Sequence, residues 1–430
     1  MPHPEAPASS FLRISGATLG QRTWAVWLGL LVLVTLGRAA SAIDDLEAEE
    51  DIADLLPYRF PGPENETARD RPWALLPQVG YGPDTSGLAG LKLTDYDVGD
   101  LGVRLDLGAT AALKGQIGAA LSIGTSNLLD NRLVVLVRAR FQNDPQREFF
   151  GLGNNDIGDY VTTNGIRDIG GGLTVGWRPF DRLAFNFQVA SRKVDIDEGR
   201  EHDDDEEPNT TPERFPHLVG VHGGVVTPVA LSLVWTSRND VMRPTRGLRV
   251  ILKALHANRE LLSDFEYSQF SLDAGYLRSF NHRRQVVGVR VNGQWIEAPR
   301  RRLPYWDQSE LGGGDTLRGF YPHRFLGHGR VLVNLELRSR LLEFDFFDLW
   351  HVNLDGVLFG DGGRVFSTRH QIEEDFGEDD DIPGRLVDHV QYSYGVGVRI
   401  ALAQALVARI DVGFSREETG LVFLSFGHTF

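Results

Sequence analysis

Long segments in which apolar and polar side chains alternate dominate the chain from about residue 73 to its C-terminus. In the segment 287–295, for example, Val291 and Trp295 share one face and Arg290 lies on the other. Strands of soluble proteins centre on roughly 5–6 residues, and these segments run longer, at about the ~9–11 residues that a tilted membrane strand needs. Charged side chains also stand in mid-segment, which a wet lumen accommodates. The pattern predicts an all-β transmembrane β-barrel.

Sixteen such segments can be counted, an even number, as is usual for bacterial barrels. The connections support this count, because long links follow the odd-numbered segments and mostly tight links follow the even-numbered ones. The long links are 143–163, 194–220, 297–327 and 363–389. We expect the tight links to face the periplasm and the long ones to face the exterior. This parity requires the weak first segment, 73–82, to be a strand, and so predicts a 16-stranded antiparallel barrel.

The N-terminal part of the chain resembles a secretory signal. Arg13 and Arg22 precede one apolar run, 24–36, which is too short to span a bilayer comfortably as a helix, and Ala40-Ser41-Ala42 follows as a cleavage site. An uncleaved anchor is the alternative. The residues after it are acidic and contain prolines, and are too few for a separate domain. We therefore expect a signal peptide over 1–42, an acidic periplasmic tail over 43–72 and an outer-membrane β-barrel over 73–430.

Four short motifs stand in or beside the expected links. The longest is a glycine-rich approach to an arginine, Leu311-Gly312-Gly313-Gly314-Asp315-Thr316-Leu317-Arg318-Gly319-Phe320. Another, at the end of the thirteenth segment, is Phe359-Gly360-Asp361-Gly362-Gly363. The remaining two are a turn over 237–247 and the run Phe149-Phe150-Gly151-Leu152-Gly153-Asn154. Together these motifs resemble those of the BamA/TamA outer-membrane assembly superfamily, the bacterial surface antigen family, over residues 73–430.

Elementary electrostatics explains the arginine and the aspartate independently of that resemblance. A loop that carries Arg318 into a confined lumen between strands 11 and 12 needs a carboxylate partner, and a bidentate pair fixes its orientation. Asp361 has the parity of an inward-facing residue, and so has Glu336 on the adjacent strand. We predict that Arg318 lies between them, with Gly319 allowing close approach to the wall and Phe320 following in the motif. Bracing of the barrel and gating of its lumen both fit this loop lock.

Two further sets of residues follow from the strand pattern. The inward faces carry charges that would line the lumen: Arg290, Arg338, Arg340, Arg399, Arg409 and Asp411. The last segment alternates up to a terminal phenylalanine, and Phe426 and Phe430 resemble the C-terminal signal by which outer-membrane barrels are recognised for insertion.

Nothing in the sequence indicates catalysis or a cofactor. No nucleophile elbow and no phosphate-binding loop is present, and His323 and His328 lack a zinc-binding context. The acidic runs 195–207 and 373–381 lack the spacing of a calcium loop, so we expect solvated loops there rather than sites for cations that bridge lipopolysaccharide. The net charge of -15 disfavours nucleic acid, and the absence of cysteine excludes thiolate metal sites. We expect no enzyme activity, no cofactor and no metal.

The resemblance implies an outer-membrane protein that acts in the assembly or transport of other proteins. The segment before the barrel is too short for the family's periplasmic POTRA modules, so we expect the chain to lack them and a separate periplasmic partner to replace them. Outer-membrane lipid, lipopolysaccharide and an unfolded client protein are the other expected partners. The alternative is a loop-gated pore or a structural surface antigen without insertase activity.

Overall fold

The computed structural model describes residues 73–426, except 96, 131, 155–160, 200–209, 241–242, 283, 347–349, 378–388 and 403–405. The expected signal peptide (1–42), the acidic tail (43–72) and Phe430 lie outside the described residues.

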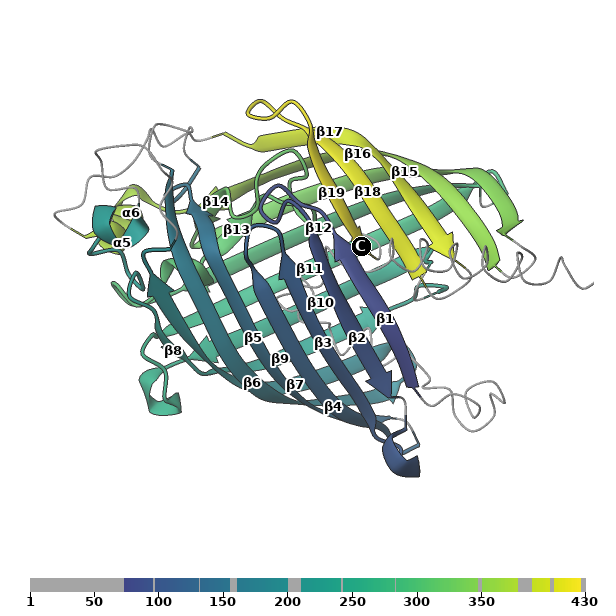
Figure 1. Ribbon diagram of the computed structural model, residues 1–430, viewed down its shortest axis with the longest axis horizontal. Helices are drawn as coiled ribbons and strands as arrows, with labels where there is room; N and C mark the ends of the chain where they lie inside the picture. The colour runs from purple at the N-terminus through teal and green to yellow at the C-terminus, as the bar shows by residue number, and fades with distance from the viewer. Residues whose placement is uncertain are drawn as a thin grey trace, which may run out of the picture.

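Seventeen of the described strands form one antiparallel sheet that curves into a barrel (Figure 1). In chain order these strands are β1 (Trp73–Gly80), β2 (Leu88–Asp95), β3 (Arg104–Ala112), β4 (Ile117–Leu128), β5 (Leu133–Phe149), β6 (Thr162–Phe180), β7 (Leu183–Asp197), β8 (Gly224–Val226), β9 (Pro228–Thr236), β10 (Gly247–Ala257), β11 (Tyr267–Phe280), β12 (Gln285–Glu297), β15 (Gly329–Phe346), β16 (Trp350–Phe366), β17 (Gln391–Leu402), β18 (Leu406–Phe414) and β19 (Leu421–Phe426). Apart from β8 and β9, strands that follow one another in this order pair with each other. β8 and β9 both pair with β7 and occupy one position, so the described wall has sixteen positions, as predicted.

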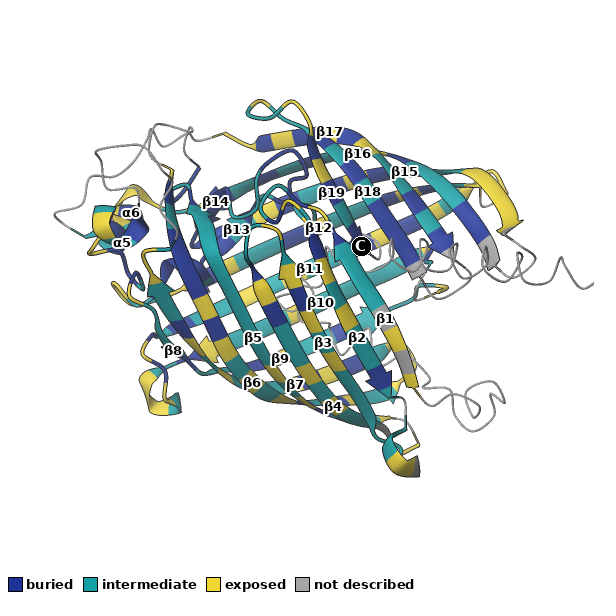
Figure 2. Ribbon diagram, viewed as in Figure 1, coloured by how far each residue is buried: buried dark blue, intermediate teal, exposed yellow. Residues whose placement is uncertain are grey.

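The apolar faces of the strands point outward and the polar faces inward. Along β12, Val291 and Trp295 are 40% and 57% exposed, whereas Asn292 between them is buried. The exposed and buried bands alternate along the wall in Figure 2. This is the reverse of a soluble protein, whose apolar face would be covered by a core. The alternation predicted from the sequence therefore separates an apolar outer surface from a polar interior.

The four longest links lie at one end of the barrel, as predicted. At this end, here called the loop end, lie 81–87, 113–116, 150–161, 198–223, 258–266, 298–328, 367–390 and 415–420. At the other, the turn end, lie 96–103, 129–132, 181–182, 237–246 and 281–284, of which 96–103 and 237–246 are longer than the shortest link of the loop end. The first strand is present as expected: β1 pairs with β2 over eight residues.

Several strands run past their predicted ends: β7 continues to Asp197 and β16 to Phe366, and the largest error concerns β5. The sequence placed a loop at 143–163, but β5 runs on to Phe149, with a register irregularity between Asp144 and Arg147. The alternation disappears in this part of β5 because its side chains are mostly polar. A strand that leaves the apolar belt no longer needs an apolar face, so periodicity could not find its end.

The described loops pack over one another at the loop end around an apolar cluster. It includes Phe149 from β5, Phe215 after the short helix α5 (Thr211–Arg214) and Phe376 of helix α6 (Arg369–Phe376). Three 3-10 turns, η1 (Val98–Asp100), η2 (Arg259–Leu261) and η3 (Tyr305–Asp307), complete the described helical elements. None of these helices is long and apolar enough to cross a membrane.

The first and last described strands meet almost without pairing. β18 and β19 share six residue pairs, whereas β1 and β19 are joined by a single bridge between Tyr81 and Leu424. There the Leu424 amide donates to the Tyr81 carbonyl at 2.9 Å. The barrel is therefore nearly closed, with an unsealed seam between β1 and β19. The last strand was expected to reach residue 430; the structure describes it to Phe426.

Candidate functional site: the loop–wall charge cluster

The link 298–328 between the eleventh and twelfth positions, here called loop L6, folds into the barrel. It contains a two-stranded sheet of β13 (Ser309–Leu311) and β14 (Phe325–Gly327). An apolar cluster that includes Leu317, Phe320 and Phe325 is fully buried at its centre. The rings of Phe320 and Phe325 meet edge to face with centroids 5.2 Å apart. Phe320 thus belongs to the core of L6 and shapes the turn that carries Arg318.

Arg318 lies between Asp361 and Glu336, the arrangement expected from the sequence. Its Nε and Nη2 donate to the two Asp361 carboxylate oxygens at 2.8 and 2.6 Å, and its Nη1 donates to Glu336 at 2.6 Å. All three side chains are 0% exposed. Burial acts to lower the pKa of the Arg318 guanidinium, but hydrogen bonding and charge from these carboxylates raise it above its usual value.

Most of the other expected lumen charges join the same cluster. Arg399 donates to Asp411 at 2.7 Å and to Glu336 at 3.2 Å, and Arg338 donates to Glu336 at 2.8 Å. Arg409 donates to the Asp315 carboxylate of L6 at 2.7 Å. The cluster therefore contains four arginines, 318, 338, 399 and 409, and four carboxylates, 315, 336, 361 and 411. Asp315 is 57% exposed, whereas the other seven side chains are buried. The balance of opposite charges lets the buried groups stay ionised.

Two expected lumen residues pair with carboxylates outside this cluster. Arg290 donates to Asp273 on the neighbouring strand at 2.7 Å, and it touches the cluster at the backbone carbonyl of Asp315, at 3.1 Å. Arg340 pairs with Glu343 and Asp355 near the turn end, at 3.4 and 3.5 Å.

Two wall residues complete the Arg318 site, and the sequence did not single them out for it. The guanidinium carbon of Arg318 lies 3.6 Å from the centroid of the Phe359 ring, a close cation–π contact. Gly413 on β18 faces the backbone of L6, where a Cβ atom would come within 1.7 Å of the Arg318 carbonyl oxygen. Phe359 has the same inward parity as Asp361, a signal that could have found it. Gly413 shares the inward parity of Arg409 and Asp411, but parity could not show that the position requires glycine, since that requirement arises only from the approach of L6.

A second anchor holds L6 on another part of the wall. Asp307 at the end of η3 forms an ion pair with Arg192 of β7. It also accepts a hydrogen bond of 2.6 Å from the Tyr267 hydroxyl of β11. Arg192 in addition lies over the Trp306 ring, 4.9 Å from its centroid, and pairs with Asp168 at 2.7 Å. L6 is thus fixed to β7 and β11 as well as to β15, β16 and β18.

The motif at 149–154 and the turn at 237–247 have structural contacts. Asn154 donates to the Val365 carbonyl at 2.8 Å and accepts from its amide at 3.3 Å, and Gly153 bridges to Leu326 of L6. The 237–247 motif forms the turn between β9 and β10, where the Asn239 side chain accepts from the Thr245 and Arg246 amides. The first motif therefore fastens L6 and the second shapes a turn.

The two histidines pair with carboxylates of neighbouring loop residues. His323 lies 2.5 Å from Glu310, whose pKa is lowered to about 2: burial acts to raise it, and the charge and hydrogen bond of His323, together with the charges of Arg147 and Arg330, outweigh that effect. His328 lies 2.8 Å from Asp375 of α6. Among the described residues, no group of three or more such side chains is placed to hold a metal ion. The acidic runs 195–207 and 373–381 lie partly outside the described residues, so their expected solvation stays a prediction.

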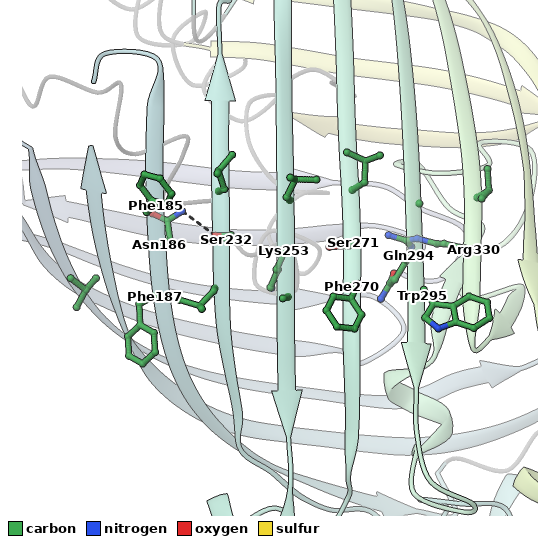
Figure 3. A pocket seen from close by; sticks show the side chains of 18 of the residues that line it. Phe185, Asn186, Phe187, Ser232, Lys253, Phe270, Ser271, Gln294, Trp295 and Arg330 are labelled. Atoms are coloured by element: carbon green, nitrogen blue, oxygen red, sulfur yellow. Dashed lines mark hydrogen bonds between the residues drawn. The ribbon is translucent and has the colours of Figure 1, made fainter. Parts of the chain in front are cut away.

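A hollow of about 990 Å³ lies elsewhere, against β7, β9, β10, β11, β12 and β15 (Figure 3). Phe187, Phe270 and Trp295 line it and are exposed. They belong to the apolar outer faces of their strands, so lipid contact explains the hollow without a polar ligand.

Comparison with known proteins identifies the family. A profile of the Omp85 superfamily domain matches residues 101–430. The chain belongs to the Omp85 superfamily. Membership of the Omp85 superfamily places the chain in the bacterial outer membrane and confirms the resemblance to BamA-type barrels. No curated protein sequence matches the chain.

Solved Omp85 barrels share the fold at low sequence identity. BamA from Haemophilus ducreyi lacking POTRA domains 1–3 superposes with a TM-score of 0.61 and 14% identity, over 83% of this chain and 70% of that chain. CdiB from Escherichia coli superposes with a TM-score of 0.58 and 12% identity, over 83% of this chain and 63% of that chain. These likenesses establish a common barrel fold.

Proposed function

We propose that this Omp85 barrel is not an enzyme but inserts or translocates polypeptides in the outer membrane, acting through the seam between β1 and β19. The observation that carries the proposal is that, among the described residues, a single bridge between Tyr81 and Leu424 joins the two edges, whereas β1 and β2 pair over eight residues and β18 and β19 over six. Unpaired backbone groups are costly in lipid, and an exposed strand edge is a ready template for another strand. A client strand that added to this edge would satisfy those groups.

Loop L6 supports one side of this seam. A Cβ atom at Gly314 would lie 3.3 Å from the Phe423 ring of β19, and Arg409 of β18 donates to the Gly314 carbonyl at 2.9 Å. The Arg318 cluster adds three more strands, β15, β16 and β17, through Glu336, Asp361 and Arg399. We propose that this loop lock holds the C-terminal side of the barrel rigid while the β1 edge moves. Bracing and gating would then be two effects of one contact.

The proposed partners follow from this activity. An unfolded outer-membrane client would bind the strand edge, and a separate periplasmic protein would deliver it in place of POTRA modules. The exposed apolar belt and the loop end would meet lipid and lipopolysaccharide. The segment that ends in Phe426 and Phe430 would direct the barrel's own insertion.

A reversible lock of the seam tests the proposal. The chain has no cysteine, so a Tyr81→Cys/Leu424→Cys pair can form only the intended disulfide within the chain. Bridged antiparallel residues have Cα atoms roughly 4.5–5.5 Å apart, which suits a disulfide. Val412→Cys/Val422→Cys on β18 and β19 is the matched control, because that pair is already sealed. We expect the oxidised seam pair alone to deplete client proteins from the outer membrane, with recovery on reduction. An unchanged outer-membrane proteome would contradict an insertase or translocase.

A loop-gated pore is the second candidate, favoured by partly accessible charges on the inner wall away from the cluster, such as Arg104, Asp106 and Arg290. Conductance in planar bilayers separates the two. If the protein is a pore, we expect a stable open channel whose conductance rises in Arg318→Ala. We also expect this conductance to persist when the seam disulfide is formed. A purely structural surface antigen predicts neither conductance nor a change in the proteome.

A further inference from the structure

The turn end of the barrel carries an unusual concentration of arginine. Four consecutive links in the wall join β4 to β5, β6 to β7, β9 to β10 and β11 to β12. These links and the three strand residues before each of them contain eight described arginines, named here the arginine rim: Arg132, Arg178, Arg182, Arg238, Arg243, Arg246, Arg278 and Arg284. Five of them are exposed, namely Arg132, Arg182, Arg246, Arg278 and Arg284.

The rim is basic in a strongly acidic chain. The same described stretches contain three carboxylates, Asp130, Asp181 and Asp240, so eight arginines less three aspartates leave a charge of +5. The whole chain carries -15. The links on either side of the rim are acidic, with Asp97 near β2 and Glu343 and Asp345 near the end of β15. The rim is therefore a local patch of positive charge.

The chain supplies a segment of opposite charge at the same end of the barrel. Residues 43–72 contain ten acidic and three basic side chains, and seven of the carboxylates fall within 44–54, where there is no basic residue. The segment joins the barrel at Trp73, which pairs with Asp95 beside the turn-end link 96–103. Its attachment point and the rim thus share the turn end.

The length of the connection suits the distance it must cover. β1 occupies the first of sixteen wall positions and the rim spans the fourth to the eleventh, so the rim is centred on the far side of the barrel. Strands about 4.8 Å apart with a tilt of roughly 40° give a sixteen-stranded barrel a diameter of roughly 30 Å. A flexible chain of about 20–30 residues has a root-mean-square length of roughly 24–30 Å. A tether that matches the span gives the highest effective concentration.

We infer that the acidic segment 43–72 docks in cis on the arginine rim. Arginine forms directional hydrogen bonds with carboxylates, and the tether keeps the segment in reach of them. The proposal is independent of insertase activity. Anionic phospholipid headgroups are a competing ligand for the same arginines, and the experiment distinguishes the two.

Paired cysteines in the full chain test the docking. Ala48→Cys in the acidic block is combined either with His282→Cys on a rim link or with Leu101→Cys on the link 96–103. His282 and Leu101 are both exposed. Leu101 follows β2, next to the attachment point of the acidic segment. If the segment does not dock, its tether alone should therefore favour the disulfide with position 101 over that with position 282. We expect the rim pair to form its disulfide about threefold faster or more at low salt, and this preference to vanish near 1 M salt.

Charge variants complete the test. Arg246→Glu/Arg284→Glu on the rim should abolish the preference, and Arg259→Glu/Arg300→Glu at the loop end should leave it intact. Changing the seven carboxylates of 44–54 to amides should abolish it without touching the barrel, which covers the case in which the rim variant fails to fold. Equal rates at both sites, or faster reaction at Leu101, would overturn the proposal. Equal rates together with loss of phosphatidylglycerol retention in the rim variant would assign the rim to lipid.

Discussion

At the scale of single residues, the site depends on an arginine that is completely enclosed and completely paired. The Arg318 guanidinium donates hydrogen bonds to Asp361 and Glu336, and its planar face packs on the Phe359 ring. A buried ion pair is weak evidence for net stability, because desolvation offsets the attraction. We expect its stronger effect to be on the position of the loop, since a shift of L6 would leave Asp361 and Glu336 without these hydrogen bonds.

Removing Arg318 should cost more than removing it together with a carboxylate. Arg318→Ala leaves Asp361 and Glu336 with an unbalanced buried charge, and we expect a loss of about 3–5 kcal/mol in barrel stability. Arg318→Gln combined with Glu336→Gln restores the balance and should lose less than the sum of the two single changes. Denaturant unfolding in detergent of the wild type, Arg318→Gln, Glu336→Gln and the double variant measures this coupling. Strict additivity would show that the two charges do not interact.

Gly413 should also be required for the position of the loop. In Gly413→Ala the new methyl group would meet the Arg318 carbonyl oxygen, so the loop must shift, at roughly 1–3 kcal/mol. Gly293→Ala on β12 is the matched control, because nothing lies within 4 Å of a Cβ atom there. We expect faster hydrogen exchange in residues 312–320 of the first variant only. Equal exchange in the two variants would refute the close approach.

At the scale of elements, L6 is anchored to the barrel wall at two separate places. Its Arg318 end contacts β15 and β16, and its Asp307 end contacts β7 and β11. Asp307 lies just before the 311–320 motif, but its partner Arg192 is more than a hundred residues earlier in the sequence. Single substitutions at either end should therefore leave the other end in place.

Asp307→Asn should loosen only the second anchor. The amide keeps the size of the side chain but loses the charge that pairs with Arg192, at roughly 1–3 kcal/mol. Asp195→Asn is the control, because its pair with Lys193 is largely exposed and worth little. We expect protease cleavage within 298–328 to rise modestly in Asp307→Asn and sharply when Arg318→Ala is added. Full release of L6 by Arg318→Ala alone would disprove the second anchor.

At the scale of the whole molecule, the weakly paired seam between β1 and β19 distinguishes this barrel from a fully closed one. Strands such as β15 and β16 are paired on both sides over more than ten residues, while β1 and β19 each have one side nearly open. Local opening should be easiest where fewest hydrogen bonds must break.

Amide exchange should therefore be fastest at the seam. We expect the amides of β1 and β19 that face the seam to exchange well before those of β15 and β16 in nanodiscs. Residue-resolved mass spectrometry gives the comparison, with β6 as a second reference strand paired on both sides. Equal protection of all strands would mean that the barrel closes in the membrane.

The sequence by itself determined the features that repeat locally. Alternation is a property of neighbouring residues, so it predicted the barrel, the sixteen positions, the lengths of the links and the inward parity of Asp361 and Glu336. With the arginine motif, this was enough to predict the contacts of Arg318. It could not fix the end of β5, because that strand leaves the apolar belt and loses its pattern.

Only the tertiary structure decided the features that join distant parts of the chain. The need for glycine at 413 arises from the backbone of L6, about a hundred residues earlier in the sequence. The pairing of Asp307 with Arg192 and the weak bridge between Tyr81 and Leu424 are likewise contacts between residues without local periodicity in common. Periodicity states which way a side chain points, whereas barrel closure and loop insertion decide what it meets.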